Sequence, residues 1–380
     1  MRHGRRGRKE GSIYKRADGR WAGAIDLGYS TGRRKRKVVY GLTRSEVFDK
    51  LQKKLAEQSQ GFPIASVGRL NMERFLNDWL ATIKPNVRIR TYERYETIVR
   101  LHLVPPMGHI RIERLTPVHV QALLDEKLAA GLSPRTVQSI RIVLRSALQK
   151  AVKWQMLARN VADVVDAPRM VNREMCALSP SEARTFLIAA TDDRLYALYL
   201  LGLACGLRRG ELLGLKWSDL DLDAKTLAVR RSLGRSINGI VIDEPKTARG
   251  KRTVKLADSI VAALRAHRAA QAREHLKAGA KWQPDSEWVF TTSIGTAIDP
   301  RNLVSEFHDL LKRSKVSTAI NFHGLRHSYA TIALAAGVHP KIVSETLGHS
   351  RISLTLDTYS HSLPTLQAES ADRVANVLVG

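Results

Sequence analysis

The feature that most constrains the fold is a set of three helix starts, each with a capping hydroxyl residue followed directly by proline. Thr116–Pro117, Ser133–Pro134 and Ser179–Pro180 have this form. A Ser or Thr side chain accepts a hydrogen bond from the first helical turn, and proline fits the first helical position because its missing N–H would have no partner there. The second start is followed by apolar residues at helical spacing, namely Val137, Ile140, Leu144, Leu148 and Val152. The chain must therefore contain long helices that each bury one face.

Four helices are expected in one helical domain, residues 66–165. They are predicted over residues 70–83 and 89–103, from Thr116 to just before Gly131, and from Ser133 through Val152. Residues 61–63 (GFP) break the pattern before this domain, and residues 160–174, with Pro168, are typical of a linker after it.

A small basic domain is predicted over residues 1–62. Three strands are expected at residues 11–15, 21–27 and 37–40, with turns at 18–19 and 31–32. A helix should follow from Thr43 to about Gln58, with Glu46 completing a capping box. This segment holds 17 Lys and Arg against 6 Asp and Glu, a net charge of +11.

Several groups of basic residues are candidates for DNA contact. Residues 1–10 form either a solvated tail or an arm that orders against phosphates. The small sheet could enter a major groove with a basic face, and the cations of the fourth predicted helix could face either solvent or the DNA backbone. The candidates are Arg5, Arg6, Arg33, Arg34, Lys35, Arg36, Arg135, Arg141 and Arg145.

The third domain is expected over residues 173–380. It should begin with a helix capped by Ser179, with Glu182 completing a capping box, and continue into a buried apolar helix at 195–203. Three strands (227–232, 239–244 and 252–256) and four helices (258–276, 301–314, 324–336 and 340–347) should follow. The fold class is therefore α+β, mostly α, with two small antiparallel sheets, one in the basic domain and one here.

Charge selects the class of partner. The 62 Lys and Arg residues exceed the 36 Asp and Glu residues, which leaves +26. Such a field favours a polyanion, and nucleic acid is the first candidate. The cations are spread along the whole chain rather than gathered beside an apolar span, which disfavours an anionic membrane surface. No stretch is long enough to span a membrane and no secretory signal precedes the first domain, so a cytoplasmic protein with reduced Cys176 and Cys205 is expected.

Sequence motifs for cofactors are absent. The chain has no Walker A loop, no dinucleotide glycine fingerprint, no His-Glu-x-x-His and no metal-ligand spacing of cysteines. Any chemistry is therefore expected to run without nucleotide or zinc.

The C-terminal part carries a set of polar residues suited to phosphodiester cleavage. His323 and Arg326 are three residues apart and share a helix face, and His349 and Tyr359 follow. Arginine forks pair with phosphate oxygens, lysine or histidine can protonate a leaving oxygen, and a tyrosine nucleophile would store the bond energy in a phosphotyrosine ester. Rejoining would then need no ATP.

Each of these residues also has an ordinary structural interpretation. A tyrosine near a C-terminus usually packs, Arg208 could simply follow a helix end, His323 could be an interior histidine, and Lys246 could be a turn cation. Residues 337–350 also have the pattern of a helix-turn-helix, which would favour a regulator. The order and joint presence of the residues favour chemistry.

Residues 173–380 resemble the catalytic domain of the tyrosine recombinases, the phage integrase family. Five motifs occur in the family's order, at residues 206–212 (GLRRGEL), 245–247 (PKT), 323–327 (HGLRH), 347–350 (LGHS) and 358–361 (TYSH). The helices at 66–165 resemble that family's core-binding, SAM-like domain, and residues 1–62 are similar to the arm-binding domain of integrases that use two kinds of DNA site.

The resemblance implies a role for each site residue. Tyr359 would be the nucleophile that forms a 3′-phosphotyrosine bond, and Arg208 and Arg326 would hold the scissile phosphate. The remaining assignments are Lys246 as the acid that protonates the 5′-hydroxyl, His323 as the base toward the tyrosine, His349 as a donor to a phosphate oxygen, and Glu211 as a support for the first arginine.

The resemblance also implies partners. These are core-type and arm-type sites on double-stranded DNA, a homotetramer that exchanges strands through a Holliday junction, and DNA-bending and directionality factors, in the nucleoid of a bacterial cytoplasm. Residues after Tyr359 would dock on a neighbouring subunit or on their own domain. The function implied is an integrase of a phage or mobile element. The alternatives are a type IB topoisomerase-like nicking-closing enzyme and a non-catalytic helix-turn-helix regulator.

Overall fold

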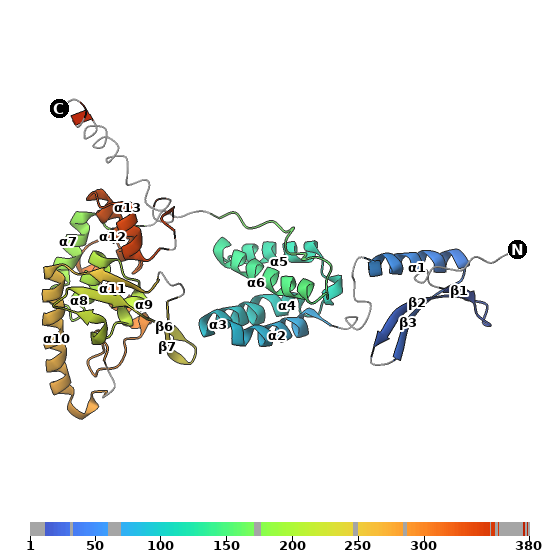
Figure 1. Ribbon diagram of the computed structural model, residues 1–380, viewed down its shortest axis with the longest axis horizontal. Helices are drawn as coiled ribbons and strands as arrows, with labels where there is room; N and C mark the ends of the chain where they lie inside the picture. The colour runs from blue at the N-terminus through green and yellow to red at the C-terminus, as the bar shows by residue number, and fades with distance from the viewer. Residues whose placement is uncertain are drawn as a thin grey trace. The chain divides into compact units, whose positions relative to one another are not determined.

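The chain forms two compact units, residues 1–172 and 173–380. The computed structural model describes residues 12–30, 33–59, 70–170, 176–245, 250–283, 287–349, 351–353, 356, 375–376 and 378. Figure 1 shows the elements of each unit. No helix in these ranges is long and apolar enough to cross a membrane.

The first unit begins with a three-stranded antiparallel sheet and one helix. Strands β1 (Ser12–Lys15), β2 (Trp21–Ser30) and β3 (Arg33–Gly41) lie in sequence order, and α1 (Arg44–Ser59) packs on β2 and β3. The predicted strands are confirmed, and β2 and β3 are longer than expected. The helix starts as predicted, because the Glu46 N–H donates to Thr43 Oγ1 at 3.1 Å. The Glu46 carboxylate, however, accepts from the Leu42 N–H at 2.9 Å, one residue earlier than a capping box requires.

The helical part of this unit has the expected helices with one irregularity. It contains α2 (Met72–Ile83), α3 (Ile89–Ile98), α4 (Val104–Met107), α5 (Pro117–Ala129) and α6 (Pro134–Lys153). The predicted helix over 89–103 is α3 followed by a π-helical segment, Val99–Leu103. The buried face of α6 is the predicted one, with Val137, Ile140, Leu144 and Leu148 at 0% exposure.

The linker after this domain starts later than predicted. Residues 160–165 pack on the helices, and Val161, Ala162 and Val165 are buried. The Asn160 side chain donates to the Arg145 carbonyl at 2.9 Å, which fixes the turn into this segment. The residue types in 160–165 are typical of a loop. They are buried because they pack on the hydrophobic core of the helical part of this unit.

The second unit is built around α8 (Tyr196–Cys205), which is apolar on all sides. Its residues Leu198, Tyr199 and Leu201 are fully buried, and it packs against α10 (Asp258–Ala278) and α12 (Gly324–Ala335). A helix that is hydrophobic all round belongs in the interior of a domain. The remaining helices are α7 (Pro180–Ala189), α9 (Arg209–Leu213), α11 (Pro300–Arg313) and α13 (Pro340–Leu347).

The second unit carries two small sheets where one was expected. The predicted strand 227–232 is two strands, β5 (Thr226–Val229) and β6 (Ser232–Ser236), in different sheets. Strands β4 (Leu220–Asp221), β5 and β8 (Arg252–Lys255) form one antiparallel sheet, and β6 pairs with β7 (Gly239–Asp243) in a hairpin. The chain changes sheet at Arg230–Arg231, where the Arg231 guanidinium donates to the buried Asp219 carboxylate at 2.5 Å.

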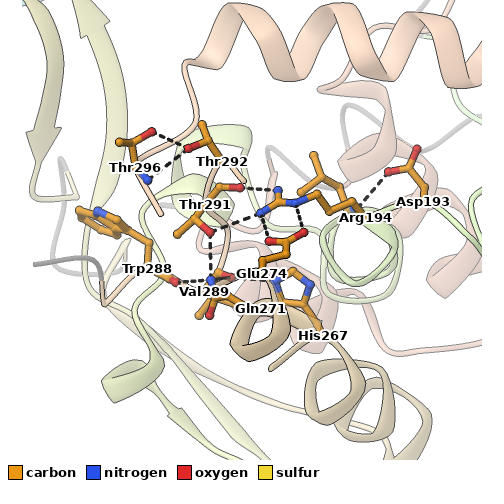
Figure 2. A network of polar contacts seen from close by, with 11 residues as sticks. Asp193, Arg194, His267, Gln271, Glu274, Trp288, Val289, Thr291, Thr292 and Thr296 are labelled. Atoms are coloured by element: carbon orange, nitrogen blue, oxygen red, sulfur yellow. Dashed lines mark hydrogen bonds and ion pairs between the residues drawn. The ribbon is translucent and has the colours of Figure 1, made fainter. Parts of the chain in front are cut away.

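A polar network fastens α10 to the rest of this unit (Figure 2). Arg194, just before α8, donates from Nε and Nη2 to the two Glu274 oxygens, each at 2.6 Å, and also to the Thr291 carbonyl. Gln271 donates to the Thr291 hydroxyl at 3.1 Å. This network joins the start of α8, the middle of α10 and residues 288–292, so it stabilises the unit through side chains rather than through the sheet.

Candidate active site

Arg208 is presented by a sharp turn at the end of α8. Gly206 has φ +61°, and a Cβ there would lie 2.6 Å from Tyr329 Cδ1, so only glycine fits. The chain then starts α9, and Arg208 precedes its first residue. The Arg208 N–H and Nη1 donate to Glu211 at 2.9 and 2.7 Å. The Arg208 side chain stays 40% exposed while Glu211 is buried, so the carboxylate holds the guanidinium without removing it from solvent.

Glu211 has a second cationic partner that was not predicted, Arg252 in β8. Arg252 Nη1 and Nη2 donate to the two Glu211 oxygens at 3.2 and 2.9 Å. Burial by itself raises the pKa of Glu211, but the hydrogen bonds and charges of Arg252 and Arg208 outweigh it, so the pKa lies below its ordinary value. The role predicted for Glu211, support of the first arginine, therefore has a physical basis in this geometry.

A sequence signal for Arg252 existed. An acidic residue beside a run of apolar residues, as Glu211 is beside Leu212 and Leu213, should be buried and therefore paired. Arg252 opens a predicted strand close to Lys246, but the sequence does not distinguish it from the neighbouring cations Arg249 and Lys251. The pairing itself joins residues 41 apart and needs the fold.

Arg326 is 2% exposed and joins two chain segments. It lies in the first turn of α12 and donates from Nη1 to the Gly206 carbonyl at 2.8 Å and from Nη2 to the Leu347 carbonyl at 2.6 Å. These carbonyls belong to the end of α8 and the end of α13. Arg326 is thus both a fixed positive charge at the site and a structural cross-link, a second role that the sequence did not indicate.

His323 directly precedes α12, one turn before His327. Their rings meet edge to face with centroids 4.8 Å apart. His323 is an exposed residue. The protein atoms around its ring nevertheless desolvate the imidazole, which lowers its pKa, and the positive charges of Arg326 and Arg208 lower it further. Desolvation, followed by the interactions with His323 and Arg326, lowers the pKa of His327 to about 4. Both imidazoles are therefore neutral near pH 7. His327 was not predicted as a site residue, although its i+4 spacing from His323 was a signal.

His349 follows α13 through a left-handed glycine. Gly348 has φ +66°, and the His349 N–H donates to the Ser344 carbonyl at 3.0 Å, which closes the helix end. Burial lowers the pKa of His349 to about 4, and Arg326, Arg208 and Arg252 contribute in the same direction. The electrostatic interactions among these side chains and the two hydrogen bonds of Arg326 show that residues from three of the predicted motifs lie close together. These residues are Arg208, Glu211, His323, Arg326 and His349.

The remaining predicted residues lie outside the described residues, in β3 or in α6. Lys246, Tyr359, Arg5 and Arg6 lie outside the described residues, and the side chains of residues 33–36 are also outside the description. In α6, Arg135 is exposed, Arg141 Nε donates to the Val165 carbonyl at 3.1 Å, and Arg145 Nε donates to Asp163 at 2.5 Å. The last two cations therefore have intramolecular partners that hold residues 160–165.

The described cluster is chemically matched to a phosphodiester. It offers one accessible guanidinium, Arg208, which can pair with a non-bridging oxygen, one buried guanidinium, Arg326, which supplies a fixed positive charge, and neutral imidazoles that can donate or accept a proton. No set of three or more His, Cys, Asp or Glu residues in the described part of the chain is arranged to hold a metal ion.

Comparison with known proteins agrees with this chemistry. Residues 177–365 match the model of the phage integrase family, and residues 71–128 match that of the phage integrase N-terminal SAM-like domain. A tyrosine recombinase XerC-like protein of Caldanaerobacter subterraneus subsp. tengcongensis is 30% identical over 366 residues, covering 90% of this chain and 92% of the relative.

Two solved structures share the fold. The Tn1549 transposon integrase in complex with a circular intermediate DNA has a TM-score of 0.67 at 23% identity and covers 79% of this chain and 99% of its own. A lambda integrase tetramer bound to a Holliday junction has a TM-score of 0.58 at 16% identity, over 89% of this chain and 95% of its own. The fold, the matched family models and the site together show that this chain belongs to the phage integrase family and is a tyrosine recombinase, an enzyme of site-specific DNA recombination.

Proposed function

We propose that this recombinase cleaves and rejoins DNA through a 3′-phosphotyrosine bond to Tyr359 and so integrates and excises a phage or another mobile element. The observation that carries the proposal is the cluster of Arg208, Arg326, His323 and His349 around one place in the second unit. A phosphodiester anion is the ligand that such a cluster fits, and fixed positive charge that stabilises a developing phosphorane is typically the largest catalytic contribution.

The surroundings of Arg208, Arg326, His323 and His349 support the roles proposed for them, and the role of Lys246 is what the resemblance implies. Arg208 keeps its side chain accessible and would pair with a non-bridging oxygen, and Arg326 would supply a second, rigid positive charge. His323, with its lowered pKa, is neutral and suited to accept the tyrosine proton, while a neutral His349 can donate one N–H to the phosphate. Lys246 would protonate the departing 5′ oxygen.

We further propose that each of the three domains has a separate role. Residues 1–62 would bind arm-type DNA, residues 66–165 core-type DNA, and residues 173–380 would carry out catalysis. The assembly would be a homotetramer on two DNA segments, as in the lambda integrase complex with a Holliday junction. DNA-bending and directionality factors would assist it on the nucleoid, in the cytoplasm of a bacterial host.

Proposed DNA contacts fall in two groups. Arg5, Arg6 and the cations of β3 (Arg33, Arg34, Lys35 and Arg36) would bind arm-type sites through phosphates. Arg135 is exposed and would reach the core-site backbone directly. Arg141 already donates to the Val165 carbonyl and Arg145 to the Asp163 carboxylate. Each would have to share its guanidinium with a phosphate, so their contribution to DNA affinity would be smaller than that of Arg135.

A nicked suicide duplex tests this proposal. The duplex carries the attachment core, taken from the direct repeats that flank the element's gene. A nick just downstream of the cleavage site lets the short fragment with the free 5′-hydroxyl diffuse away, which traps the covalent complex. Wild-type protein should form an adduct, and Tyr359→Phe should bind equally well and form none. An undiminished adduct in Tyr359→Phe would remove Tyr359 from its role. Relaxation of any supercoiled plasmid without the core would favour a topoisomerase, and binding without an adduct in wild type would favour a regulator.

A further inference from the structure

Arg252 occupies a position between two parts of the active site. Its Nη1 and Nη2 donate to the two oxygens of Glu211, and its Nε donates to the Thr346 carbonyl at 2.5 Å. Glu211 in turn holds Arg208. Thr346 is in the last turn of α13, three residues before His349. A single guanidinium thus bridges the carboxylate that orients one site residue and the helix end that delivers another.

The Glu211 carboxylate is fully used in this arrangement. Oε1 accepts from Arg208 Nη1 and Arg252 Nη1, and Oε2 accepts from the Arg208 N–H and Arg252 Nη2. The side chains of Glu211 and Arg252 are 5% and 7% exposed. In a buried site a carboxylate keeps its charge only when such donors are present, so Arg252 and Arg208 together keep Glu211 ionised.

The end of α13 depends on the same residue. The Thr346 carbonyl accepts from Arg252, and the next carbonyl, that of Leu347, accepts from Arg326. Carbonyls of a last helical turn have no intrahelical partner and carry partial negative charge, so two guanidinium groups there fix the helix end. Gly348 and His349 follow from this fixed point.

We propose that Arg252 is a positioning residue for DNA cleavage: it holds Glu211 against Arg208 and at the same time fixes the end of α13 from which His349 enters the site. The inference rests on the proposed roles of Arg208 and His349. Arg252 does not contact the DNA in this scheme, because its three donor nitrogens are directed to Glu211, Thr346 and Gly250. It acts through the residues that do.

Arg252→Met in the full-length protein tests the inference, and Arg194→Met is the matched control. Arg194 makes the same two-oxygen pair with a glutamate, Glu274, in the network that fastens α10 (Figure 2). Loss of either pair should lower the melting temperature. Only Arg252→Met should slow single-turnover adduct formation on the nicked core duplex, by up to about 100-fold, because a misplacement of about 1 Å in a catalytic group can cost that much. DNA affinity, measured by fluorescence anisotropy on the same duplex, should stay within about 3-fold.

The pH profile separates positioning from general stabilisation. Without Arg252, only Arg208 opposes the effect of burial, so the pKa of Glu211 lies higher than in wild type, and Glu211 loses its ionic hold on Arg208 earlier as pH falls. Cleavage by Arg252→Met should therefore fall at a higher pH than wild-type cleavage as the solution is made more acidic. This shift should disappear when Glu211→Gln is added, since glutamine does not titrate. Arg252→Lys keeps the charge but not the fork, so it should restore the wild-type profile and only part of the rate.

Three outcomes would overturn the inference. Arg252→Met could cleave at the wild-type rate, or it could lose no more activity than Arg194→Met, or its pH profile could run parallel to that of wild type. If Arg252→Met does not fold, Arg252→Lys carries the same test through its rate. An absence of adduct in wild-type protein is a separate result, which would overturn the proposed function and this inference with it.

Discussion

The two site arginines should differ sharply in what their loss does to stability. Both Arg208→Met and Arg326→Met remove a guanidinium and keep a side chain of similar length, and both should abolish DNA cleavage. Arg326 is buried and donates to the carbonyls of Gly206 and Leu347, whereas the Arg208 side chain is 40% exposed. The same chemical change therefore removes an internal cross-link in one case and a partly solvated ion pair in the other.

The magnitude follows from the bonds that each arginine makes. A hydrogen bond to a charged group contributes about 1.5–3 kcal/mol, so the two bonds of Arg326 correspond to about 3–6 kcal/mol. For a domain of this size, 1 kcal/mol shifts the melting temperature by about 2–4 °C, so Arg326→Met should melt roughly 6–24 °C below wild type. The Arg208 end of its ion pair is solvated and the buried Glu211 keeps Arg252 as a partner, so the loss of Arg208 should cost about 1 kcal/mol, and Arg208→Met should melt within about 4 °C of wild type.

Differential scanning calorimetry of the full-length variants measures this difference. The transition of residues 173–380 should move in Arg326→Met and stay almost in place in Arg208→Met, with both variants inactive on the suicide duplex. Equal melting temperatures would contradict this expectation, because they would mean that the two carbonyl bonds of Arg326 add nothing to the folded state.

Three further predictions concern the histidine pair, the glycine turn and the basic N-terminal domain. His327 has a folded pKa of about 4 against an ordinary 6.5, so its unfolded form takes up a proton first and stability falls by about 1–2 kcal/mol from pH 7 to pH 5. His327→Gln should remove that part of the pH dependence in denaturant titrations at the two pH values, and an unchanged dependence would contradict it. Gly206→Ala should lower the free energy of unfolding by about 2–5 kcal/mol, because it adds backbone strain at positive φ and a Cβ 2.6 Å from Tyr329. Gly337→Ala is the control: φ is +78° but the space around it is open, so the free energy of unfolding should fall by only about 1–2 kcal/mol. Removal of residues 1–62 should lower the log–log salt slope of DNA binding by about 0.9 for each phosphate that this domain neutralises, and an unchanged slope would mean that it neutralises none.

Local signals predicted most of the fold. Capping residues and proline predicted the starts of α5, α6 and α7 to the residue, because a helix start is decided by hydrogen bonds within one turn. The apolar period predicted the buried face of α6 for the same reason. Motif order indicated that Arg208, Glu211, His323, Arg326 and His349 lie near one another.

Features that depend on distant segments were missed. The segment over residues 227–232 has the pattern of one strand, and nothing local shows that the chain changes sheet at the Arg231–Asp219 ion pair. Residues 160–165 have loop composition, and the contacts that bury them come from α6. Arg252 resembles any other strand-edge cation until the fold brings it to Glu211.

Tyrosine-mediated cleavage is tested most directly by identifying the residue that joins the DNA. Wild-type protein trapped on the nicked core duplex would be digested with nuclease and trypsin, and the nucleotide-bearing peptide sequenced by mass spectrometry. We predict a single modified peptide with the nucleotide on the phenolic oxygen of Tyr359, through a 3′ phosphate. A modified residue elsewhere in the chain, or a linkage through a 5′ phosphate, would contradict the proposed chemistry.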